Sequence, residues 1–431
     1  MRIGVRAPAG TSGATRATFG GRTFASLRLH RNYRLYFWGQ FLSQTGTWLQ
    51  SAAMAWLVLQ LTHSAFAVGM LAFWQFGPYA VFGLFGGAIT DRLDQRTTLI
   101  ATQVGLAICS AGMAALTLTH VVVLWEAYAI AAARGLILVL NNPSRQAFIV
   151  QMVGREELPN AIALNSSVAN ATRIIGPGVG GILIAAFGVG VCFSLDAVSY
   201  VAVVVALLLM RVEELLPIER REKRSVLRGT AEGLRYAQRT PTVRLALTIF
   251  AFVAIMSINF SVLLPLVASQ TLDAGAQVYG LLTACFGAGA LAGALLSASF
   301  GRATWRILLV SAGGFGLGEF LLAPQRTVIG AILLLLATGI CYTLYTSNTN
   351  ALVQLATPGY LQGRVAGLYS YLFAGSSPFG ALIAGGLAER GGTQLAFFVA
   401  GATALICAAS GYAARRNLPA SPTSPLLDSV A

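Results

Sequence analysis

Residues 87–96 read GAITDRLDQR, and the organisation of the chain follows outward from them. Asp91 and Arg92 are the first cluster of charge after a long apolar run, and another apolar run begins at Thr97. Each run has about the length that a helix needs to cross ~30 Å of hydrocarbon, because a helix rises ~1.5 Å per residue. The charged stretch therefore lies either at a membrane surface or between two buried helices of a very large soluble core.

The composition decides between these two settings. Of the 431 residues, 56% are hydrophobic and 10% are charged, whereas soluble domains carry about 25% charged residues. A globular chain with so few polar residues could not cover its own surface. In lipid, by contrast, a helix satisfies its own backbone hydrogen bonds. The sequence therefore predicts an all-α polytopic membrane protein.

The sequence contains no pattern that predicts an enzyme, a metal site or a cofactor. No phosphate-binding loop, GxSxG elbow or HExxH helix is present, and the three histidines flank apolar runs. The cysteines lie in apolar runs without CxxC spacing, as small buried side chains do; they are Cys109, Cys192, Cys285, Cys341 and Cys407. We expect a protein that is not an enzyme and that binds neither a metal nor a cofactor.

Apolar segments of membrane-spanning length recur along the chain. We predict twelve transmembrane helices, at 35–61, 66–89, 97–118, 121–141, 161–187, 190–210, 243–268, 277–300, 305–323, 327–354, 363–387 and 394–414. The polar segment between the sixth and seventh, Arg211–Arg239, carries eight basic residues and five glutamates. It is typical of an amphipathic or partly helical linker on the membrane surface.

These segments divide the chain into two bundles with basic flanks. The expected division is a basic tail at 1–34, a six-helix bundle at 35–210, a linker at 211–242, a second six-helix bundle at 243–414 and a tail at 415–431. The first tail holds seven arginines and no acid. It lacks the apolar core of a secretory signal. We expect it to stay on the cytoplasmic side, with a transit peptide as the alternative.

The basic residues indicate how the chain is oriented. With the N-terminus inside, the inner segments (the tails and the loops near 92–96, 144–155, 211–244, 302–306 and 364) hold 25 of the 29 Lys and Arg. The outer side keeps only Arg326 and Arg390. By the positive-inside rule we expect a multi-pass protein of the cell's inner (plasma) membrane with both termini cytoplasmic. The net charge of +14 then reflects orientation rather than a nucleic-acid surface.

Matching features recur in the two halves of the chain at nearly constant separations. The offsets are 210 for Arg34-Leu35 and Arg244-Leu245, 211 for Gly69 and Gly280, 206 for Gly87 and Gly293, and 201 for Gly176-Pro177 and Ser377-Pro378. They indicate one six-helix unit used twice in parallel orientation. Such repeats place a substrate site near the membrane midplane, at the interface of the halves.

Twelve spans in two sets of six, a basic central loop, and the spacing of Gly87, Asp91, Arg92 and Arg96 resemble the major facilitator superfamily. The resemblance covers roughly 31–416. It implies that the glycine lets helices approach and that the Asp and Arg cap and bridge helix ends in a gating loop on the inner side.

This copy of the loop departs from the superfamily pattern at two positions. Asp94 and Gln95 stand where Gly and Arg are usual. The corresponding stretch of the second half, 293–302, lacks the Asp-Arg pair. Any gating by these loops is therefore expected to be asymmetric.

The fifth span narrows the resemblance to exporters. Gly176, Pro177, Gly180 and Gly181 resemble a motif of exporters that run as antiporters, although Thr172 replaces a usual Gly. Independently of any family, a proline kinks a helix and glycines let a neighbouring helix approach closely. A tightly packed, kinked helix is the alternative reading of the same residues.

Three further stretches carry narrower resemblances. Residues 32–37 and 192–200 are similar to the subfamily that contains the enterobactin exporter and the macrolide efflux pumps. Arg134-Gly135 in the fourth span resembles a superfamily signature linked to proton coupling.

Charged residues within the spans are the strongest functional candidates. A charge at the bilayer centre costs ~2.5–3.5 kcal/mol on insertion scales, so it should face a partner or a cavity. Arg134 and Arg173 lie in the middle of spans 4 and 5, with Glu126 and Asp196 as candidate counter-charges, and Glu319 lies in span 9 without a cation in its own span. Because spans 3, 6, 9 and 12 of the superfamily usually lie outside the cavity, we favour Glu126 as the coupling residue.

Two interpretations of these charges stay open. One is a structural ion pair or network that braces the first bundle. The other is a basic lining for an anionic or polar group of a substrate, with Glu126 or Asp196 titrating as protons cross.

Polar faces on four spans add substrate candidates, although aromatic residues at helical spacing also serve packing. They are Gln40, Gln44, Thr47 and Ser51 in span 1, Ser257 and Asn259 in span 7, Tyr342, Tyr345, Thr346 and Thr349 in span 10, and Tyr369 and Ser370 in span 11.

The sequence predicts a secondary active transporter. It would export a hydrophobic or amphiphilic small molecule, such as a siderophore, a drug or another secondary metabolite, by proton antiport with alternating access. Its expected partners are that small molecule, protons and the lipid bilayer, and we expect a monomer. The alternatives are a lipid flippase or an importer or uniporter of the same fold, and a non-transporting membrane sensor.

Overall fold

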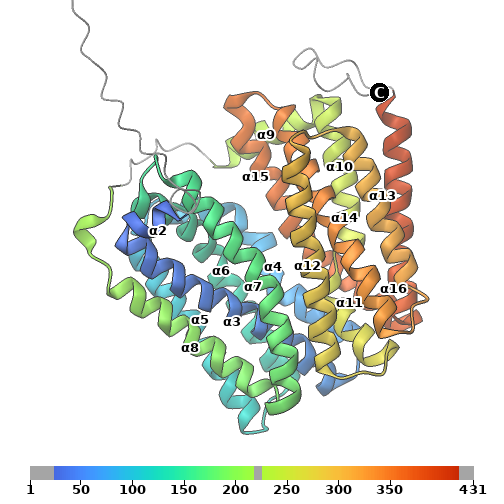
Figure 1. The fold of residues 1–431 in the computed structure, drawn as a ribbon, viewed down its shortest axis with the longest axis horizontal. Coiled ribbons are helices and arrows are strands. Elements are labelled where there is room, and N and C mark those ends of the chain that lie inside the picture. The colour runs from blue at the N-terminus through green and yellow to red at the C-terminus, as the bar shows by residue number, and fades with distance from the viewer. Residues whose placement is uncertain (1–23, 218–225, 417–431) are drawn as a thin grey trace, which may run out of the picture.

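The described chain folds entirely into helices. In the computed structural model, residues 24–217 and 226–416 are described, and within them every regular element is helical (Figure 1). The tails at 1–23 and 417–431 and part of the predicted linker, 218–225, lie outside the described residues.

The first half of the chain forms a short helix and six long ones. They are α2 (Ala25–Leu29), α3 (Arg31–Thr62), α4 (Ala65–Thr90), α5 (Gln95–Leu118), α6 (Leu124–Val153), α7 (Leu158–Phe187) and α8 (Val189–Leu208). Where an apolar run starts, a polar side chain often caps it. The Ser64 hydroxyl accepts from the Ala67 amide at 3.2 Å, and a carboxylate oxygen of Asp94 accepts from the Thr97 amide at 2.8 Å.

The second half follows the same plan with more interruptions. Its elements are η1 (Val212–Glu214), α9 (Val226–Arg239), α10 (Pro241–Met256), α11 (Phe260–Leu266), the π-helical η2 (Val267–Thr271), α12 (Ala276–Phe300), α13 (Trp305–Leu322), α14 (Val328–Leu355), α15 (Gly359–Gly375) and α16 (Ser377–Arg415). The backbone leaves helical geometry at Gly391 and Gly392, where α16 passes from one span to the next.

The helices account for twelve spans. Among the described residues, ten helical stretches are long and apolar enough to cross a bilayer, and the last, Gly359–Arg415, has 57 residues and contains two spans. The remaining span is α3, which has 32 residues and a more polar sequence. The predicted all-α, twelve-span fold class is therefore confirmed.

Several predicted boundaries are wrong. The tail predicted at 1–34 contains α2 and the start of α3, the span predicted at 243–268 breaks between Met256 and Phe260, and the loop predicted near 364 lies within α15. The segment 144–155 was expected to be a loop, but α6 continues to Val153. Arg145 is consequently a helical residue near the end of the fourth span. The sequence around it is polar, and the helix is 30 residues long, or about 45 Å, so its final turns can project beyond the hydrocarbon.

The helices pack as two bundles. In the N bundle, α3 packs on α7 and α8, α4 on α6, and α5 on α6 and α8; in the C bundle, α12 packs on α14, α13 on α14 and α16, and α10 on α16. The bundles meet mainly through two pairs of helices, α4 with α16 and α7 with α12, and smaller contacts join α4 with α15 and α11 with α3 and α4. We call the two main contacts the seam. Figure 1 shows the bundles side by side with α9 at one end.

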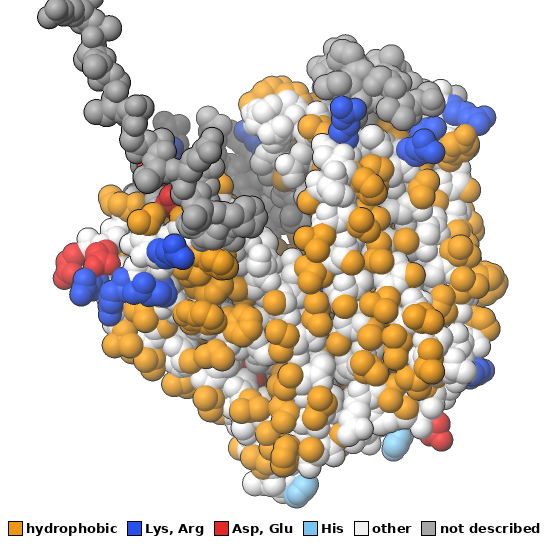
Figure 2. All heavy atoms as spheres, in the orientation of Figure 1, with side chains coloured by type: hydrophobic (Ala, Val, Ile, Leu, Met, Phe, Trp, Pro, Cys, Tyr) orange, Lys and Arg blue, Asp and Glu red, His pale blue; other side chains and the backbone are white. Residues whose placement is uncertain are grey.

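Helix α9, within the predicted linker, docks on the C bundle. The Tyr236 hydroxyl donates to the Ala356 carbonyl at 2.7 Å, and Arg364 of α15 pairs with Glu232. Figure 2 shows hydrophobic side chains covering the flanks of both bundles, while Lys and Arg gather toward the α9 end. This charge pattern is the one expected of a protein embedded in a membrane.

The seam is closed at the end opposite α9. A Cβ on Gly181 of α7 would lie 2.5 Å from the Ala276 carbonyl oxygen of α12, and one on Gly69 of α4 would lie 2.6 Å from the Ala381 carbonyl oxygen of α16. Glycine is therefore required for the backbones to approach so closely.

Packing between the bundles is looser toward the α9 end. A Cβ on Gly87 of α4, or on Gly363 or Gly367 of α15, would meet no atom within 4 Å. On α12, Gly280 is packed against Gly181, whereas Leu295, farther toward the α9 end, is 67% exposed. Helices α4 and α15 still touch, because the Tyr371 hydroxyl donates to the Ala80 carbonyl at 2.6 Å.

Substituting Gly181→Ala should disfavour this closed contact. The added methyl group overpacks the seam, at a cost of about 1–3 kcal/mol, which corresponds to a shift of roughly 5- to 150-fold in a two-state population. Spin labels on Ile89→Cys and Gly363→Cys should then report a shorter distance at the α9 end as the opposite end opens.

The matched control for this measurement is Gly178→Ala on the same helix. There the new Cβ would be 3.5 Å from the Ala284 side chain, an ordinary contact. The distance distribution of this control should equal that of the parent. A Gly181→Ala distribution that also equals the parent's would show that the glycine contact does not hold the seam closed.

Candidate substrate and coupling sites

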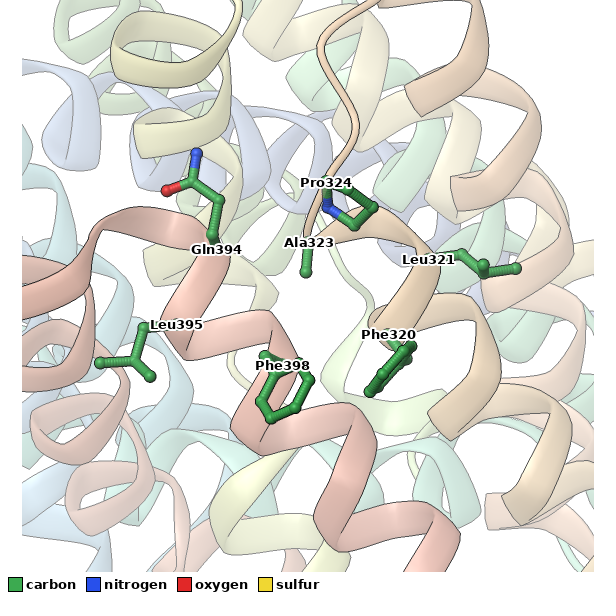
Figure 3. Close-up of a pocket in the computed structure, with 7 residues that line it drawn as sticks. All are labelled: Phe320, Leu321, Ala323, Pro324, Gln394, Leu395 and Phe398. Carbon is green, nitrogen blue, oxygen red and sulfur yellow. The ribbon is translucent and has the colours of Figure 1, made fainter.

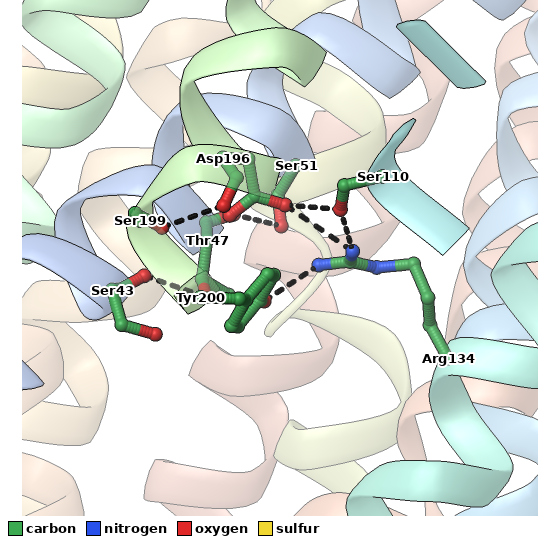
Figure 4. A network of polar contacts seen from close by, with 8 residues as sticks. All are labelled: Ser43, Thr47, Ser51, Ser110, Arg134, Asp196, Ser199 and Tyr200. Atoms are coloured by element: carbon green, nitrogen blue, oxygen red, sulfur yellow. Dashed lines mark hydrogen bonds and ion pairs between the residues drawn. The ribbon is translucent and has the colours of Figure 1, made fainter. Parts of the chain in front are cut away.

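A buried ion pair lies inside the N bundle. The Arg134 guanidinium, on α6, is 3.2 Å from a carboxylate oxygen of Asp196, on α8, and the two residues are 5% and 0% exposed. The Ser110 hydroxyl, on α5, accepts from Arg134 at 2.6 Å and donates to the same Asp196 oxygen at 2.6 Å. Figure 4 shows the three side chains converging from their helices.

The network extends to α3 through a tyrosine. Arg134 also donates to the Tyr200 hydroxyl at 3.0 Å, and that hydroxyl is 2.9 Å from the Thr47 hydroxyl. Thr47 in turn donates to the Ser43 carbonyl at 2.9 Å. Four helices are thereby tied together around one compensated charge pair, while the second oxygen of Asp196, Oδ1, is buried without a hydrogen-bond partner.

The expectation that Glu126 faces Arg134 is wrong. Glu126 lies in the first turn of α6, where its carboxylate accepts from the Val123 amide at 3.1 Å. The free amides and the positive end of a helix attract an acid to this position. Eight residues of helix, about 12 Å, separate it from Arg134, whose partner is Asp196 instead.

Arg173 occupies a different setting, on the seam. It is the sixteenth of the 30 residues of α7, and its backbone oxygen faces Gly287 of α12. Its Nε is buried without a hydrogen-bond partner, and its guanidinium carbon lies 5.3 Å from the centre of the Trp48 ring. The Arg173 side chain thus makes a cation–π contact, and it has hydrogen-bonding capacity left for a ligand.

Aromatic side chains of the C bundle lie near this arginine. Phe286 of α12 precedes Gly287, which packs on the Arg173 backbone, and its ring is 5.4 Å from that of Tyr342 on α14. We call Trp48, Arg173, Phe286 and Tyr342 the seam site. Both bundles contribute to it, so it changes shape when the bundles move.

Some of the other predicted polar residues make hydrogen bonds within the protein, and others keep a buried polar atom without a partner. Tyr369 stacks on Phe250 and donates to the Thr346 carbonyl at 2.9 Å, and Asn259 donates to the Ile255 carbonyl at 2.8 Å. On α3, an oxygen of Gln40 lies 3.5 Å from Arg145, and the Gln44 amide nitrogen is buried without a partner, as is that of Gln40.

The Gly-Pro motif of α7 contacts two helices at once. On one face, a Cβ on Gly176 would be 2.5 Å from the Trp48 Cβ, and Gly180 packs on Leu49. On the other face, the Pro177 carbonyl and Gly181 pack on Gly280 of α12. The motif therefore places α3 and α12 in contact with the same helix.

The loop at 87–96 caps helix ends through other residues than the ones expected. Asp94 caps α5, the Gln95 side chain donates to the Thr90 carbonyl at 2.7 Å, and Arg96 donates twice to the Leu207 carbonyl of α8, at 3.1 and 2.9 Å. The two residues that depart from the superfamily pattern, Asp94 and Gln95, thus make the caps.

The side chains of Asp91 and Arg92 are exposed and make no hydrogen bond or ion pair with the described part of the chain. The close approach to α6 is made by Gly86, whose Cβ would meet the Val139 carbonyl, rather than by Gly87. Asp91 and Arg92 therefore make no bridge within the described residues, and the bridge between helix ends is made by Arg96, from the start of α5 to the end of α8.

Sequence reasoning missed five residues of these sites. Ser110, Tyr200, Trp48, Phe286 and Arg145 were not among the candidates. Tyr200 follows Asp196 by four residues, so helical spacing could have placed both on one face of α8. For Ser110 and Trp48, which hold their partners across helix–helix contacts, one sequence provides no comparable signal.

An apolar cavity of about 530 Å³ lies away from the seam (Figure 3). It is formed where the end of α13 meets α16, and it is lined by Phe320, Leu321, Ala323, Pro324, Gln394, Leu395 and Phe398. Since α13 packs mainly on α14 and α16, this cavity is peripheral. A substrate there would not contact both bundles.

Twelve spans in two bundles, together with a family model that covers most of the chain, define a transporter of the major facilitator superfamily. Within that superfamily, the chain belongs to the transmembrane secretion effector family, whose family model matches residues 22–425.

The chain is similar to several curated transporters over most of its length. It is 27% identical to the MFS-type transporter YfiS of Bacillus subtilis, over 84% of this chain and 88% of that one. It is 23% identical to macrolide efflux protein A of Streptococcus pyogenes (88% and 96%) and 25% identical to the enterobactin exporter EntS of Salmonella typhimurium (84% and 86%).

Solved structures share the fold at low sequence identity. The nucleoside transporter NupG superposes with a TM-score of 0.71 at 12% identity, covering 90% of this chain and 99% of that one. A D-xylose–proton symporter superposes with a TM-score of 0.70 at 14% identity, covering 91% and 98%. The chain is thus a multi-pass membrane transporter and not an enzyme.

The Arg134–Asp196 pair should dominate the stability of the N bundle. Asp196→Ala leaves a buried, uncompensated guanidinium and should lower the free energy of unfolding by about 3–5 kcal/mol, whereas the double variant Arg134→Met/Asp196→Leu should recover most of that loss. Chemical unfolding of the detergent-purified protein measures both values.

The control is the exposed pair of Arg211 and Glu214, whose side chains are 62% and 42% accessible. Glu214→Gln should change the free energy of unfolding by no more than about 1 kcal/mol. A double variant as unstable as Asp196→Ala alone would contradict a compensated ion pair.

Proposed function

We propose that this protein is a secondary active transporter that exports a hydrophobic or amphiphilic small molecule in exchange for protons. The observation that carries the proposal is Arg173. It is a cation at the midpoint of a membrane span, on the seam between two bundles, with a buried donor that has no protein partner.

The chemistry of the seam site indicates the class of cargo. A charge in mid-membrane must be compensated, and the Trp48 ring compensates the guanidinium only in part. An anionic or strongly hydrogen-bond-accepting group on the cargo would complete its environment. The rings of Phe286 and Tyr342 would hold an apolar or aromatic body beside that group. A siderophore, a drug or another secondary metabolite with such a polar group fits this description.

The difference between the two ends of the seam supports a mechanism of alternating access. The glycine contacts near Gly181 and Gly69 close one end, while Gly87 and Gly363 have open space beside them at the other. Rocking the bundles about the seam site would reverse this arrangement and expose the site to each side of the membrane in turn. Because both bundles of one chain form the site, a monomer suffices.

We place the α9 end and both termini in the cytoplasm of a cell with an inner (plasma) membrane. The excess of Lys and Arg at this end supports that orientation. The open end of the seam would then admit cargo from the cytoplasm, as export requires. The names of the relatives agree with this direction, since they include a macrolide efflux protein, an enterobactin exporter and the multidrug efflux pump Tap of Mycolicibacterium fortuitum.

Arg173→Ala should abolish export while the protein still inserts into the membrane. Loss of the only cation of the seam site removes the anchor for the polar group of the cargo, so accumulation of cargo in cells should rise to the level of a deletion strain. A susceptibility and export screen over a panel of siderophores, macrolides and other amphiphiles measures this effect.

Two variants make the screen interpretable. Arg390→Ala removes an exposed arginine outside the seam and should export normally, and Arg173→Lys, which keeps the charge but not the planar donor geometry, should export at a reduced rate. Normal export by Arg173→Ala would refute the basic seam site. Downhill uptake without export against a gradient would favour the importer or uniporter, and translocation of lipid unaffected by an uncoupler would favour the flippase.

Glu126→Gln should leave pH-gradient coupling intact. Its carboxylate only caps the start of α6, so the amide should preserve transport and cost at most about 1–2 kcal/mol of stability. Drug-accumulation assays with and without an imposed pH gradient measure the coupling. A Glu126→Gln protein that transports downhill but ignores the gradient would restore Glu126 as the coupling residue.

A further inference from the structure

A carboxyl group in the C bundle has no counter-charge. Glu319, in the last turn of α13, is 0% exposed, and neither of its carboxyl oxygens has a hydrogen-bond partner. Among the described residues, the ion pairs formed do not include it. This group therefore differs from Asp196, whose charge is balanced by an arginine.

The helices around Glu319 supply no cation to it. Ser257, between α10 and α11, is the polar side chain that approaches the carboxyl, and its hydroxyl donates to the Ala400 carbonyl at 2.9 Å. Helices α14 and α16 pack on α13. The titratable or charged side chains of these two helices are Cys341, Tyr342 and Tyr345 on α14, and Glu389, Arg390, Cys407, Tyr412 and Arg415 on α16. The two arginines lie at the ends of the second span of α16, and Arg390 is exposed.

The internal repeat lets Glu319 of the C bundle be compared with the ion pair of the N bundle. Thr47 and Ser257 are 210 residues apart, and Ser110 and Glu319 are 209 apart, within the range of 201 to 211 at which the two halves match. Glu319 thus holds the position in the C bundle that Ser110 holds beside the ion pair of the N bundle. The C bundle has an acid at this position but no equivalent of Arg134.

We propose that Glu319 is the proton-binding residue of the transport cycle, protonated while the seam is closed at the end opposite α9. An unpaired, ionised carboxylate is costly to bury, whereas the neutral acid is far less so. Protonation would therefore favour the closed contact. When Glu319 is protonated, a proton from water forms the O–H bond of its carboxyl group. The same bond later breaks and returns the proton to water on the opposite side of the membrane. This inference rests on the proposed exchange of cargo for protons.

The position of α11 connects this acid to the movement of the bundles. The chain breaks its helix at Ser257–Asn259, beside Glu319, and α11 then contacts α3 and α4 of the N bundle. Opening the seam at this end would withdraw the N bundle from α11 and uncover the break. Water from that side would then reach the carboxyl.

A second connection leads to the seam site. Phe315 lies one turn before Glu319 on α13, and its ring is 5.8 Å from the ring of Tyr342. Cargo that displaces Tyr342 would loosen the packing over the acid and allow the proton to leave toward the α9 end. Cargo and proton would thereby exclude one another without sharing a site.

The test uses the proton itself as the ligand, with spin labels on Ile89→Cys and Gly363→Cys in the purified full-length protein. If Glu319 releases its proton as pH rises, the population with a closed α9 end should increase, by up to about tenfold per pH unit for one linked proton. Glu319→Gln, which mimics the neutral acid, should keep the long distance at every pH. Glu319→Asp, which can still ionise, should restore the response, and Glu214→Gln should respond like the parent.

The outcomes separate this inference from the proposed function. A Glu319→Gln protein that responds to pH like the parent would overturn the role of Glu319 while leaving proton-driven export intact. A parent that responds to no pH change, or responds to Na⁺ instead, would overturn proton coupling altogether. A response present in the parent and the Asp variant but absent in the Gln variant supports the assignment.

Discussion

A charge inside a membrane has to be compensated, and this constraint explains the arrangement of the two bundles. In the N bundle, Arg134, Asp196 and Ser110 satisfy one another across three helices. On the seam, Arg173 has a tryptophan ring and an unused donor. In the C bundle, Glu319 has no cation among the described residues. The three cases correspond to a structural brace, a proposed cargo anchor and a proposed proton carrier.

The two ends of the seam differ in packing, and in our proposal this difference couples the cargo site to the proton site. Backbones meet through glycines at one end, where a side chain at Gly181 or Gly69 would clash, whereas Gly87 and Gly363 toward the α9 end have open space beside them. Packed interfaces of this kind have two arrangements rather than a continuum. A ligand or proton needs only to favour one arrangement to move the whole bundle, so small changes at Arg173 or Glu319 can be transmitted over the length of a span.

The sequence predicted the twelve spans because runs of apolar residues define them. It predicted the helix-packing glycines of α7 because Gly176, Gly180 and Gly181 lie together in one segment. It named Glu126 and Asp196 as candidate partners of Arg134 but could not choose between them, since a residue eight positions away on the same helix competes with one that tertiary packing brings near. Arg145 was misplaced for a related reason, because α6 extends beyond the apolar run that marks its span.

The most direct test of proton-driven export is the flux of protons in proteoliposomes that hold the unmodified protein and a pH-sensitive dye. Adding a cargo identified by the export screen to one side should move protons in the opposite direction, and an imposed proton gradient should drive the cargo above its equilibrium concentration. Cargo that only equilibrates across the membrane, with no proton movement when it is added, would contradict antiport.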